Sequence, residues 1–250
     1  VGKKLIPVYI GLTFALWGGL TGLGTDGYTS LIRALSVIST SGISGPEKFE
    51  LDGAGFFGEL LILLFLFLAL SHTILKFFHQ QIRIKGILFD REIRLGLLIT
   101  LICTIIISLK QINMGIVYGK LVGPSETIFE LIWGNFFTVF SFITTNGYVS
   151  TFWNSPQSKA DFSSIVIILM GLCLFGGGVA TTAGGIKLLR ISILFTAFSN
   201  ETGKLLHPSS IIGKNTSQNS LEISIYMAWI FFMLFIVTVA VLTIFLALFE

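Results

Sequence analysis

Two short segments of the chain carry the oxygen atoms with which it could do chemistry, and both end in glycine. They read Ile-Ser-Thr-Ser-Gly over residues 38–42 and Ile-Thr-Thr-Asn-Gly over residues 143–147. A monovalent cation that sheds its water needs a cage of oxygens, which backbone carbonyls and Ser/Thr hydroxyls supply without a fixed charge that would trap the ion. Glycine allows positive φ and a close approach of chains. We expect part of a cation selectivity filter; two surface loops with turn-forming glycines are the alternative.

The two segments are in register with each other. Gly42 and Gly147 lie 105 residues apart, and the same offset sets Ser36 on Ser141. Each segment is preceded by one apolar stretch and followed by another, so the unit is helix, pore segment, helix, repeated in parallel. Inverted-repeat secondary transporters are built differently. The residues expected to line the filter are Ser39, Thr40, Ser41, Gly42, Thr144, Thr145, Asn146 and Gly147.

A glycine-rich stretch interrupts an apolar run further along the chain. Residues 175–187 read Phe-Gly-Gly-Gly-Val-Ala-Thr-Thr-Ala-Gly-Gly-Ile-Lys, which cannot hold a regular helix. We expect a flexible intramembrane loop, which on the cytoplasmic side of 144–147 could lie across an ion path as a gate; tight helix packing through small residues is the alternative. A phosphate-binding loop is excluded because no Gly-Lys-Ser/Thr follows. The expected gate residues are Gly176, Gly177, Gly178, Thr181, Thr182, Gly184 and Gly185.

The amino-acid composition of the whole chain indicates a membrane protein. Of the 250 residues 53% are hydrophobic and 12% are charged, about half the charged share of a soluble domain. Two segments, 28–40 and 126–145, are expected to dip into the bilayer and return as extended loops, which requires that protein or a water-filled path surround them. Five runs are long enough to span it as helices: 6–21, 54–79, 93–112, one from about 162, and 221–249.

The distribution of charged residues predicts which ends of these elements face the cytoplasm. Positive residues mark the cytoplasmic ends of membrane helices, whereas the side with the dipping segments is acidic, and an acidic mouth raises the local cation concentration. An ordinary solvated rim is the alternative. The basic residues are Lys3, Lys4, Lys76, Arg83, Lys85, Arg91, Arg94, Lys187, Arg190, Lys204 and Lys214, and the acidic ones are Asp26, Glu47, Glu50, Asp52, Glu126, Glu130 and Asp161.

The stretch from Gly176 to Arg190 resembles the third-repeat signature of the Trk/Ktr/HKT superfamily of potassium transporters (TrkH-like membrane subunits). The single-glycine filter segments resemble that family too, as does the Leu-His-Pro at 206–208. The resemblance implies an all-α membrane protein of parallel helix–pore loop–helix repeats around a pseudo-fourfold ion path. By it, 1–85 are the second repeat, 86–199 the third with its gate loop, and 200–250 a cytoplasmic linker and the first helix of the fourth.

The same resemblance implies potassium ion uptake through a filter gated by the intramembrane loop. Potassium would contact Thr40, Ser41, Thr145 and Asn146, at Ser41 and Asn146 mostly through carbonyls. It implies a multi-pass protein of the cell (inner) membrane, in contact with lipid and working as a homodimer with a cytosolic nucleotide-binding regulatory subunit. No organic cofactor and no nucleic acid are expected. The first repeat and the fourth filter segment are missing, so we expect a fragment that does not conduct alone.

Two other function classes are weighed against this one. A secondary transporter coupled to a cation (sodium, or potassium and sodium together) is disfavoured by the parallel repeat and by an expected lack of buried charges. A membrane-embedded enzyme needs a nucleophile–base pair or an ionisable cluster at membrane depth. Its candidates Glu59, His72 and Glu130 share no spacing, so we expect no enzyme.

Overall fold

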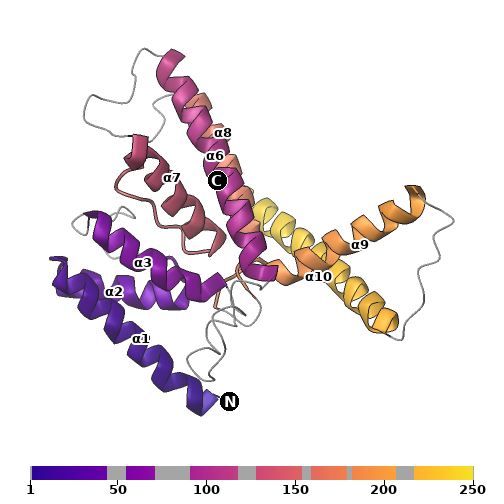
Figure 1. Cartoon of the computed structure of the whole chain (residues 1–250), viewed down its shortest axis with the longest axis horizontal. Helices are drawn as coiled ribbons and strands as arrows, with labels where there is room; N and C mark the ends of the chain where they lie inside the picture. The colour runs from indigo at the N-terminus through magenta and orange to yellow at the C-terminus, as the bar shows by residue number, and fades with distance from the viewer. Residues whose placement is uncertain are drawn as a thin grey trace. The chain divides into compact units, whose positions relative to one another are not determined.

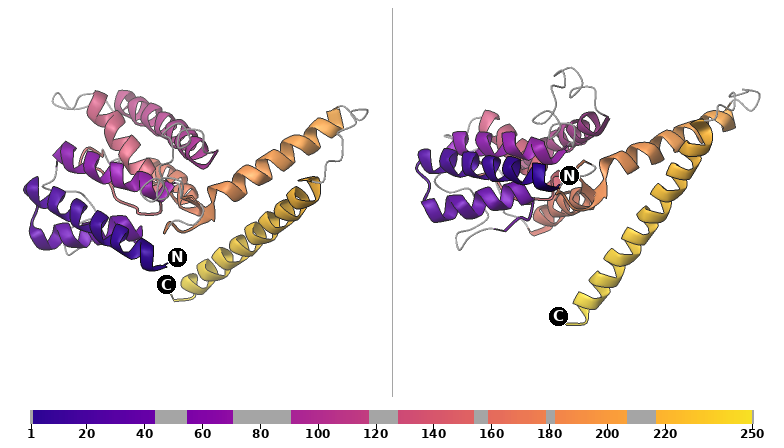
Figure 2. Two further views of the ribbon diagram at one scale, coloured as in Figure 1. Left: turned by 60° about the horizontal axis from the view of Figure 1, so that its bottom comes forward. Right: turned by 90° about the horizontal axis from the view of Figure 1, so that it is seen from below.

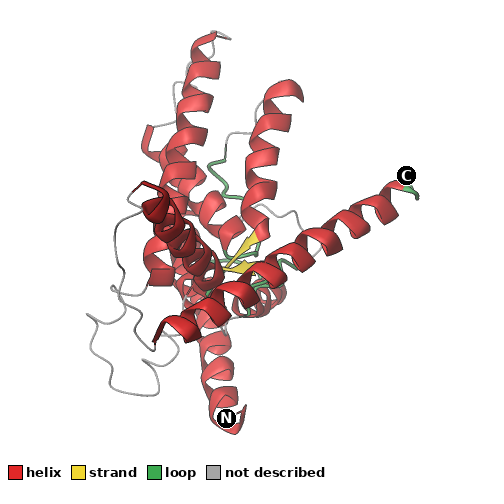
Figure 3. Ribbon diagram, turned by 90° about the vertical axis from the view of Figure 1, so that its right-hand side faces the viewer, coloured by secondary structure: helices red, strands yellow, loops and turns green. Residues whose placement is uncertain are grey.

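The structure, a computed structural model, is helical almost throughout the part of the chain that it describes (Figures 1 and 3). The chain divides into two compact units, Val1–Gly185 and Ile186–Glu250, which we describe separately. The residues described are 2–43, 55–70, 91–117, 128–153, 159–178, 182–206 and 217–249.

The first unit holds both predicted dipping segments, each between apolar helices. The segment predicted at 28–40 is helix α2, and the one predicted at 126–145 is helix α7; both end where an extended segment begins. The elements of this unit are α1 (Gly2–Gly22), α2 (Gly27–Ser39), α3 (Gly55–Leu70), α6 (Arg91–Val117), α7 (Ile128–Ile143), α8 (Lys159–Leu174) and strand β1 (Phe175–Gly176).

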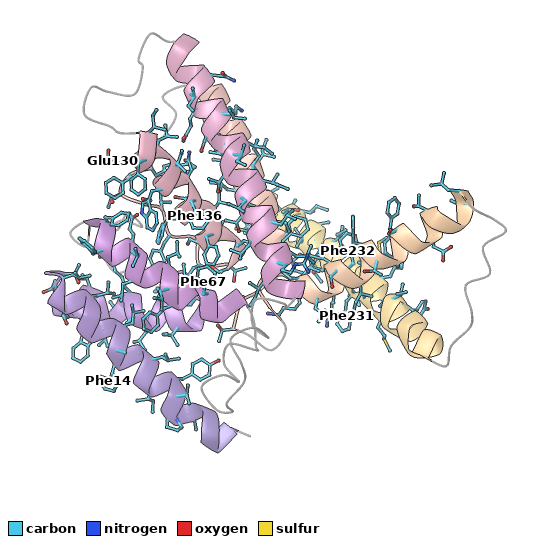
Figure 4. The ribbon with its side chains drawn as sticks, in the orientation of Figure 1. Phe14, Phe67, Glu130, Phe136, Phe231 and Phe232 are labelled. Carbon is cyan, nitrogen blue, oxygen red and sulfur yellow. The ribbon has the colours of Figure 1, made fainter. Side chains whose placement is uncertain are left out.

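The second unit holds strand β2 (Ile186–Lys187), α9 (Leu188–Leu206) and α10 (Ser217–Ala247). Helices α9 and α10 pack on each other, as Figure 2 shows. The guanidinium carbon of Arg190 lies 3.9 Å from the centroid of the Phe231 ring, a cation–π contact that joins the two helices (Figure 4). Because α8 ends at Leu174 and α9 begins at Leu188, the predicted interruption of the fourth apolar run is confirmed.

Two of the predicted spans reach full length in the described residues. Ile93–Asn113 has 21 residues and Ile225–Ala247 has 23, which at 1.5 Å per residue is about the 30 Å of the hydrocarbon core. Three other spans are shorter apolar helices where they are described: Ile6–Gly22, Gly55–Phe67 and Ile165–Leu174. The span predicted at 54–79 is described only as far as Leu70.

Helix α3 lies at the centre of the first unit, where it packs on α1, α2, α6 and α7 (Figure 1). Its contact with α7 is aromatic: Phe67 and Phe140 have ring centroids 4.8 Å apart, with Phe136 next to Phe140 (Figure 4). A second core cluster joins α6, α7 and α8 through Ile107, Val139, Ile165, Leu169 and Leu172. Helix α7 is thus fixed on both sides, which fixes the segment that follows it.

Candidate ion-binding site

Helices α2 and α7 end in the same backbone motif, 105 residues apart. Thr40 has φ 50° and Thr145 has φ 60°, and no other non-glycine residue in the described part has a positive φ. The next N–H reaches back five residues in both copies: Ser41 N to Ser36 O is 3.1 Å, and Asn146 N to Ser141 O is 2.9 Å. This is the Schellman motif, whose left-handed position is usually glycine. Threonine there costs about 1–2 kcal/mol.

Backbone strain of this kind persists only where the surrounding structure holds the residue in place, and strained residues cluster at functional sites. The glycines that end the segments have positive φ as predicted, 66° at Gly42 and 76° at Gly147. Threonine and glycine of one segment therefore adopt the conformation of their counterparts in the other. Left-handed caps are common at helix ends; what the two copies share beyond that is a threonine, in place of glycine, at the cap position.

The structure brings the two segments into contact with each other. The Gly42 N–H donates to Asn146 Oδ1 at 3.2 Å, and a Cβ placed on Gly42 would lie 2.5 Å from the Asn146 carbonyl oxygen. The Tyr148 hydroxyl donates to the Ile43 carbonyl at 3.2 Å. Asn146 therefore uses its side-chain oxygen to hold the neighbouring segment, which leaves its carbonyl as the atom that could meet an ion.

The hydroxyls of the predicted filter residues do not all face one path. Thr144 is completely buried, and its hydroxyl donates to the carbonyls of Phe140 and Ser141, so this side chain stabilises the end of α7. The Thr144 hydroxyl is therefore engaged within α7, and the placement of Thr144 in the filter stays a prediction. Ser39 is exposed and donates to Leu35 O at 2.7 Å.

The hydroxyls of Thr40 and Thr145 are placed differently from that of Thr144. Thr40 Oγ1 donates to the Ser39 carbonyl at 2.7 Å. Thr145 is only half-buried, and its hydroxyl accepts a hydrogen bond from the glycine-rich loop. Ser41 is exposed, and its hydroxyl accepts a hydrogen bond from the hydroxyl of Ser39 at 3.1 Å.

The extended segment after Gly147 runs back along α7 on a track of small residues. The Tyr148 N–H donates to Ser141 Oγ at 2.7 Å and the Ser150 N–H to Thr138 Oγ1 at 3.2 Å. At the end of the track, a Cβ on Gly134 would lie 2.7 Å from the Phe152 carbonyl oxygen. The track was not predicted from sequence, although small residues spaced four and three apart share one helix face and could have indicated it.

The equivalent position in the first copy differs. Ser36 stands where Ser141 does, yet no backbone N–H of the described residues bonds to its buried hydroxyl, which lies beside the Tyr148 side chain. The buried Asn146 Nδ2 has no hydrogen-bond partner among the described residues. The segment that follows residue 43 lies outside the described residues. The two copies therefore share the helix end but are not held in the same way.

The glycine-rich loop touches both of the predicted filter segments. The Gly184 N–H donates to Thr145 Oγ1 at 2.9 Å, and the Thr182 hydroxyl donates to the Ile38 carbonyl at 3.3 Å. The neck of the loop is too tight for side chains, because a Cβ on Gly176 would lie 1.5 Å from the Gly184 carbonyl oxygen. Gly185 has φ 68° there.

Of the three remaining predicted gate residues, two lie in the described part of the loop and one lies outside it. Gly177 and Gly178 are buried in it, whereas Thr181 lies outside the described residues. The loop therefore lies against Thr145 and the end of α2, and its role as a gate on the cytoplasmic side of 144–147 stays a prediction.

The expected lack of buried charges is wrong. Glu59 on α3 is 0% exposed and Arg33 on α2 is 5% exposed. Polar groups of the segment after Gly147 surround Glu59, and that contact joins residues too far apart in sequence to be predicted. Glu130 lies in the first turn of α7 (Figure 4), and His72 is outside the described residues. Within the described ranges, no three His, Cys, Asp or Glu side chains come together as metal ligands.

Comparison with known proteins finds relatives that are named Trk system potassium uptake proteins. The chain is 26% identical over 217 residues to the Trk system potassium uptake protein TrkG of Escherichia coli, covering 83% of this chain and 40% of that protein. It is 26% identical over 240 residues to the TrkH protein of Halomonas elongata, covering 92% of this chain and 45% of that protein. No protein-family model matches the chain.

Among solved structures, the potassium transporter TrkH from Vibrio parahaemolyticus matches with a TM-score of 0.71 at 20% sequence identity. The match covers 92% of this chain and 47% of that one, so the chain spans less than half the length of the relatives it matches. The chain thus has the all-helical membrane fold of TrkH, as predicted, and is an integral membrane protein.

Proposed function

Taking the chain as a relative of the Trk potassium uptake proteins, we propose that it forms part of a path for potassium ion uptake across the cell membrane. In this path the carbonyls of 40–42 and 145–147, with the threonine hydroxyls, supply two parts of the oxygen ring that replaces the ion's water. The observation that carries the proposal is the shared left-handed threonine, Thr40 and Thr145, at the ends of two pore helices whose following segments touch.

The loop from Gly176 to Gly185 is the gate in this proposal. Its hydrogen bonds to Ile38 and Thr145 would have to break or rearrange for the loop to leave the path, because they attach it to both filter segments at once. Neutral hydrogen bonds of this kind contribute about 0.5–1.5 kcal/mol each.

The remaining parts of the proposal follow from the similarity to the Trk proteins and from the distribution of basic residues. We propose the cell (inner) membrane, a homodimer, and a cytosolic nucleotide-binding regulatory subunit docked on the basic cytoplasmic ends. Catalysis is not part of the proposal, because the relatives are named as uptake proteins. The buried Glu59 does not favour a cation-coupled transporter either, since its carboxylate is occupied by hydrogen bonds from the protein.

The filter is tested by Gly147→Ser in the full-length protein, expressed in bacteria that lack their own potassium uptake. Gly147 has φ 76°, which a serine side chain tolerates poorly, so the carbonyls on either side should shift. We expect weaker discrimination of potassium against sodium, measured as competing uptake of the two ions.

The matched control is Gly171→Ala, since a Cβ at this α8 glycine meets no atom within 4 Å in the described residues. It should leave both the amount of protein and its selectivity unchanged. Unaltered selectivity in Gly147→Ser, with normal amounts of protein in the membrane, would refute the filter assignment.

A further inference from the structure

A carboxylate on the helix that follows the first filter segment is buried against the second one. Glu59 lies in the second turn of α3 and is 0% exposed. Its side chain faces α7 and the segment after Gly147 rather than lipid or water. A buried carboxylate is unfavourable unless hydrogen bonds replace its lost hydration.

Four donors supply that replacement. Glu59 Oε2 accepts the indole N–H of Trp133 at 2.8 Å. Both carboxylate oxygens lie 2.8 Å from the Ser150 hydroxyl. Glu59 Oε1 accepts the Thr151 N–H at 2.7 Å and the Thr151 hydroxyl at 2.8 Å. An ionised carboxylate only accepts, and its roughly four lone-pair positions match four donors.

An aromatic contact closes the same region. The Phe56 ring lies 4.5 Å from the Trp133 ring, centroid to centroid, one turn of α3 before Glu59. Phe129, one turn before Trp133 on α7, lies 5.9 Å from Phe56. These rings hold the indole N–H toward the carboxylate, and their apolar surface strengthens hydrogen bonds that water would otherwise weaken.

The two residues that Glu59 holds directly follow the filter in the chain. Ser150 and Thr151 come three and four residues after Gly147. Ser150 is fixed on its other side by its N–H bond to Thr138, so the carboxylate ties the outgoing end of the second filter segment to α3. Helix α3 is itself the continuation of the first filter segment, by way of residues 44–54, which lie outside the described part.

We propose that Glu59 is a positioning residue for the filter: its buried carboxylate fixes the distance between the two filter segments by holding Ser150 and Thr151 against α3. This proposal rests on the proposed function, because it concerns the same ion path. Glu59 itself touches no ion. It acts through the backbone between Gly147 and Thr151, which anchors the carbonyls of 145–147. Those carbonyls must keep their places within about half an ångström for a coordination site to discriminate.

Glu59→Gln in the full-length protein is the first test. Glutamine has one accepting oxygen, and its NH2 group would face the donors that surround this position. Hydrogen bonds to a carboxylate oxygen, which is a charged acceptor, are therefore lost. We expect discrimination of potassium against sodium to fall about tenfold or more and the potassium KM to rise. A residue with a merely structural role would lower the amount of protein and the maximal rate while leaving KM and selectivity unchanged, and that result would overturn the proposal.

Two milder variants keep the test decisive if Glu59→Gln does not accumulate. Trp133→Phe removes the indole N–H but keeps a ring against Phe56, and Thr151→Val removes one hydroxyl at nearly constant volume. Each should shift selectivity in the same direction by about threefold to tenfold. Wild-type selectivity in both would overturn the proposal.

A readout that does not depend on transport separates this proposal from the proposed function. Amide hydrogen exchange of the Thr151 N–H, which Glu59 accepts, should speed up about tenfold or more in purified Glu59→Gln protein. If exchange speeds up but the wild-type protein carries no potassium, the positioning role stands and the proposed function fails. Unchanged exchange in the variant would refute the positioning role even if uptake is normal.

Discussion

Replacing Gly42 by alanine would place a side-chain carbon in the contact between the two predicted filter segments. The new Cβ would stand 2.5 Å from the carbonyl oxygen of Asn146, and the backbone at Gly42 has φ 66°. A left-handed backbone costs an alanine about 1–2 kcal/mol. Overpacking against a fixed neighbour adds about 1–3 kcal/mol, so we expect a total destabilisation of about 2–5 kcal/mol.

The displacement matters more than the energy. Carbon–oxygen contacts of this kind are about 3.3–3.6 Å long, so the Asn146 carbonyl must retreat by roughly 0.8 Å or more from the 2.5 Å contact. That exceeds the roughly half-ångström tolerance of a coordination site. Because the same carbonyl is the proposed ion ligand, Gly42→Ala should lower thermal stability and also reduce discrimination of potassium against sodium.

The assay measures both quantities in the full-length protein. Thermal unfolding in detergent reports stability, and competing potassium and sodium uptake in cells reports selectivity. Gly24→Ala is the matched control, because Gly24 also has a positive φ of 95° but a Cβ there meets no atom within 4 Å in the described residues. The control should lose about 1 kcal/mol of stability and no selectivity. If Gly42→Ala keeps wild-type selectivity and is no less stable than Gly24→Ala, the inferred contact does not exist in the working protein.

Two further predictions concern single hydroxyls. Thr182→Val removes the bond to the Ile38 carbonyl and should raise basal ion flux, whereas Thr182→Ser should not; equal flux in both variants would count against the gate. Ser141→Ala removes the acceptor of the Tyr148 N–H and should cost about 1–3 kcal/mol in thermal unfolding. Ser36→Ala should cost less than Ser141→Ala, because the Ser36 hydroxyl lies beside the Tyr148 hydroxyl and binds no backbone N–H of the described residues, and equal losses would contradict the asymmetry.

Much of the architecture follows from local properties of the chain. The pore helices end within about two residues of the predicted bounds because apolar runs give way there to Ser, Thr and Gly. The break between Leu174 and Leu188 follows from five glycines in ten residues, which no helix accommodates cheaply. The offset of 105 residues was visible in the sequence, and it returned as a shared backbone conformation at Thr40 and Thr145.

The tertiary structure alone decided what these segments touch. The sequence marked Glu59 only as an unpaired ionisable residue, and its partners Trp133 and Ser150 lie 74 and 91 positions away. Asn146 and Gly42 are 104 positions apart, which is also too far for a rule based on neighbouring residues to predict their contact. Hydropathy and glycine content act over a few residues and determine where a helix ends. Which polar group meets a buried carboxylate depends on how whole helices pack, and packing is a property of the folded chain.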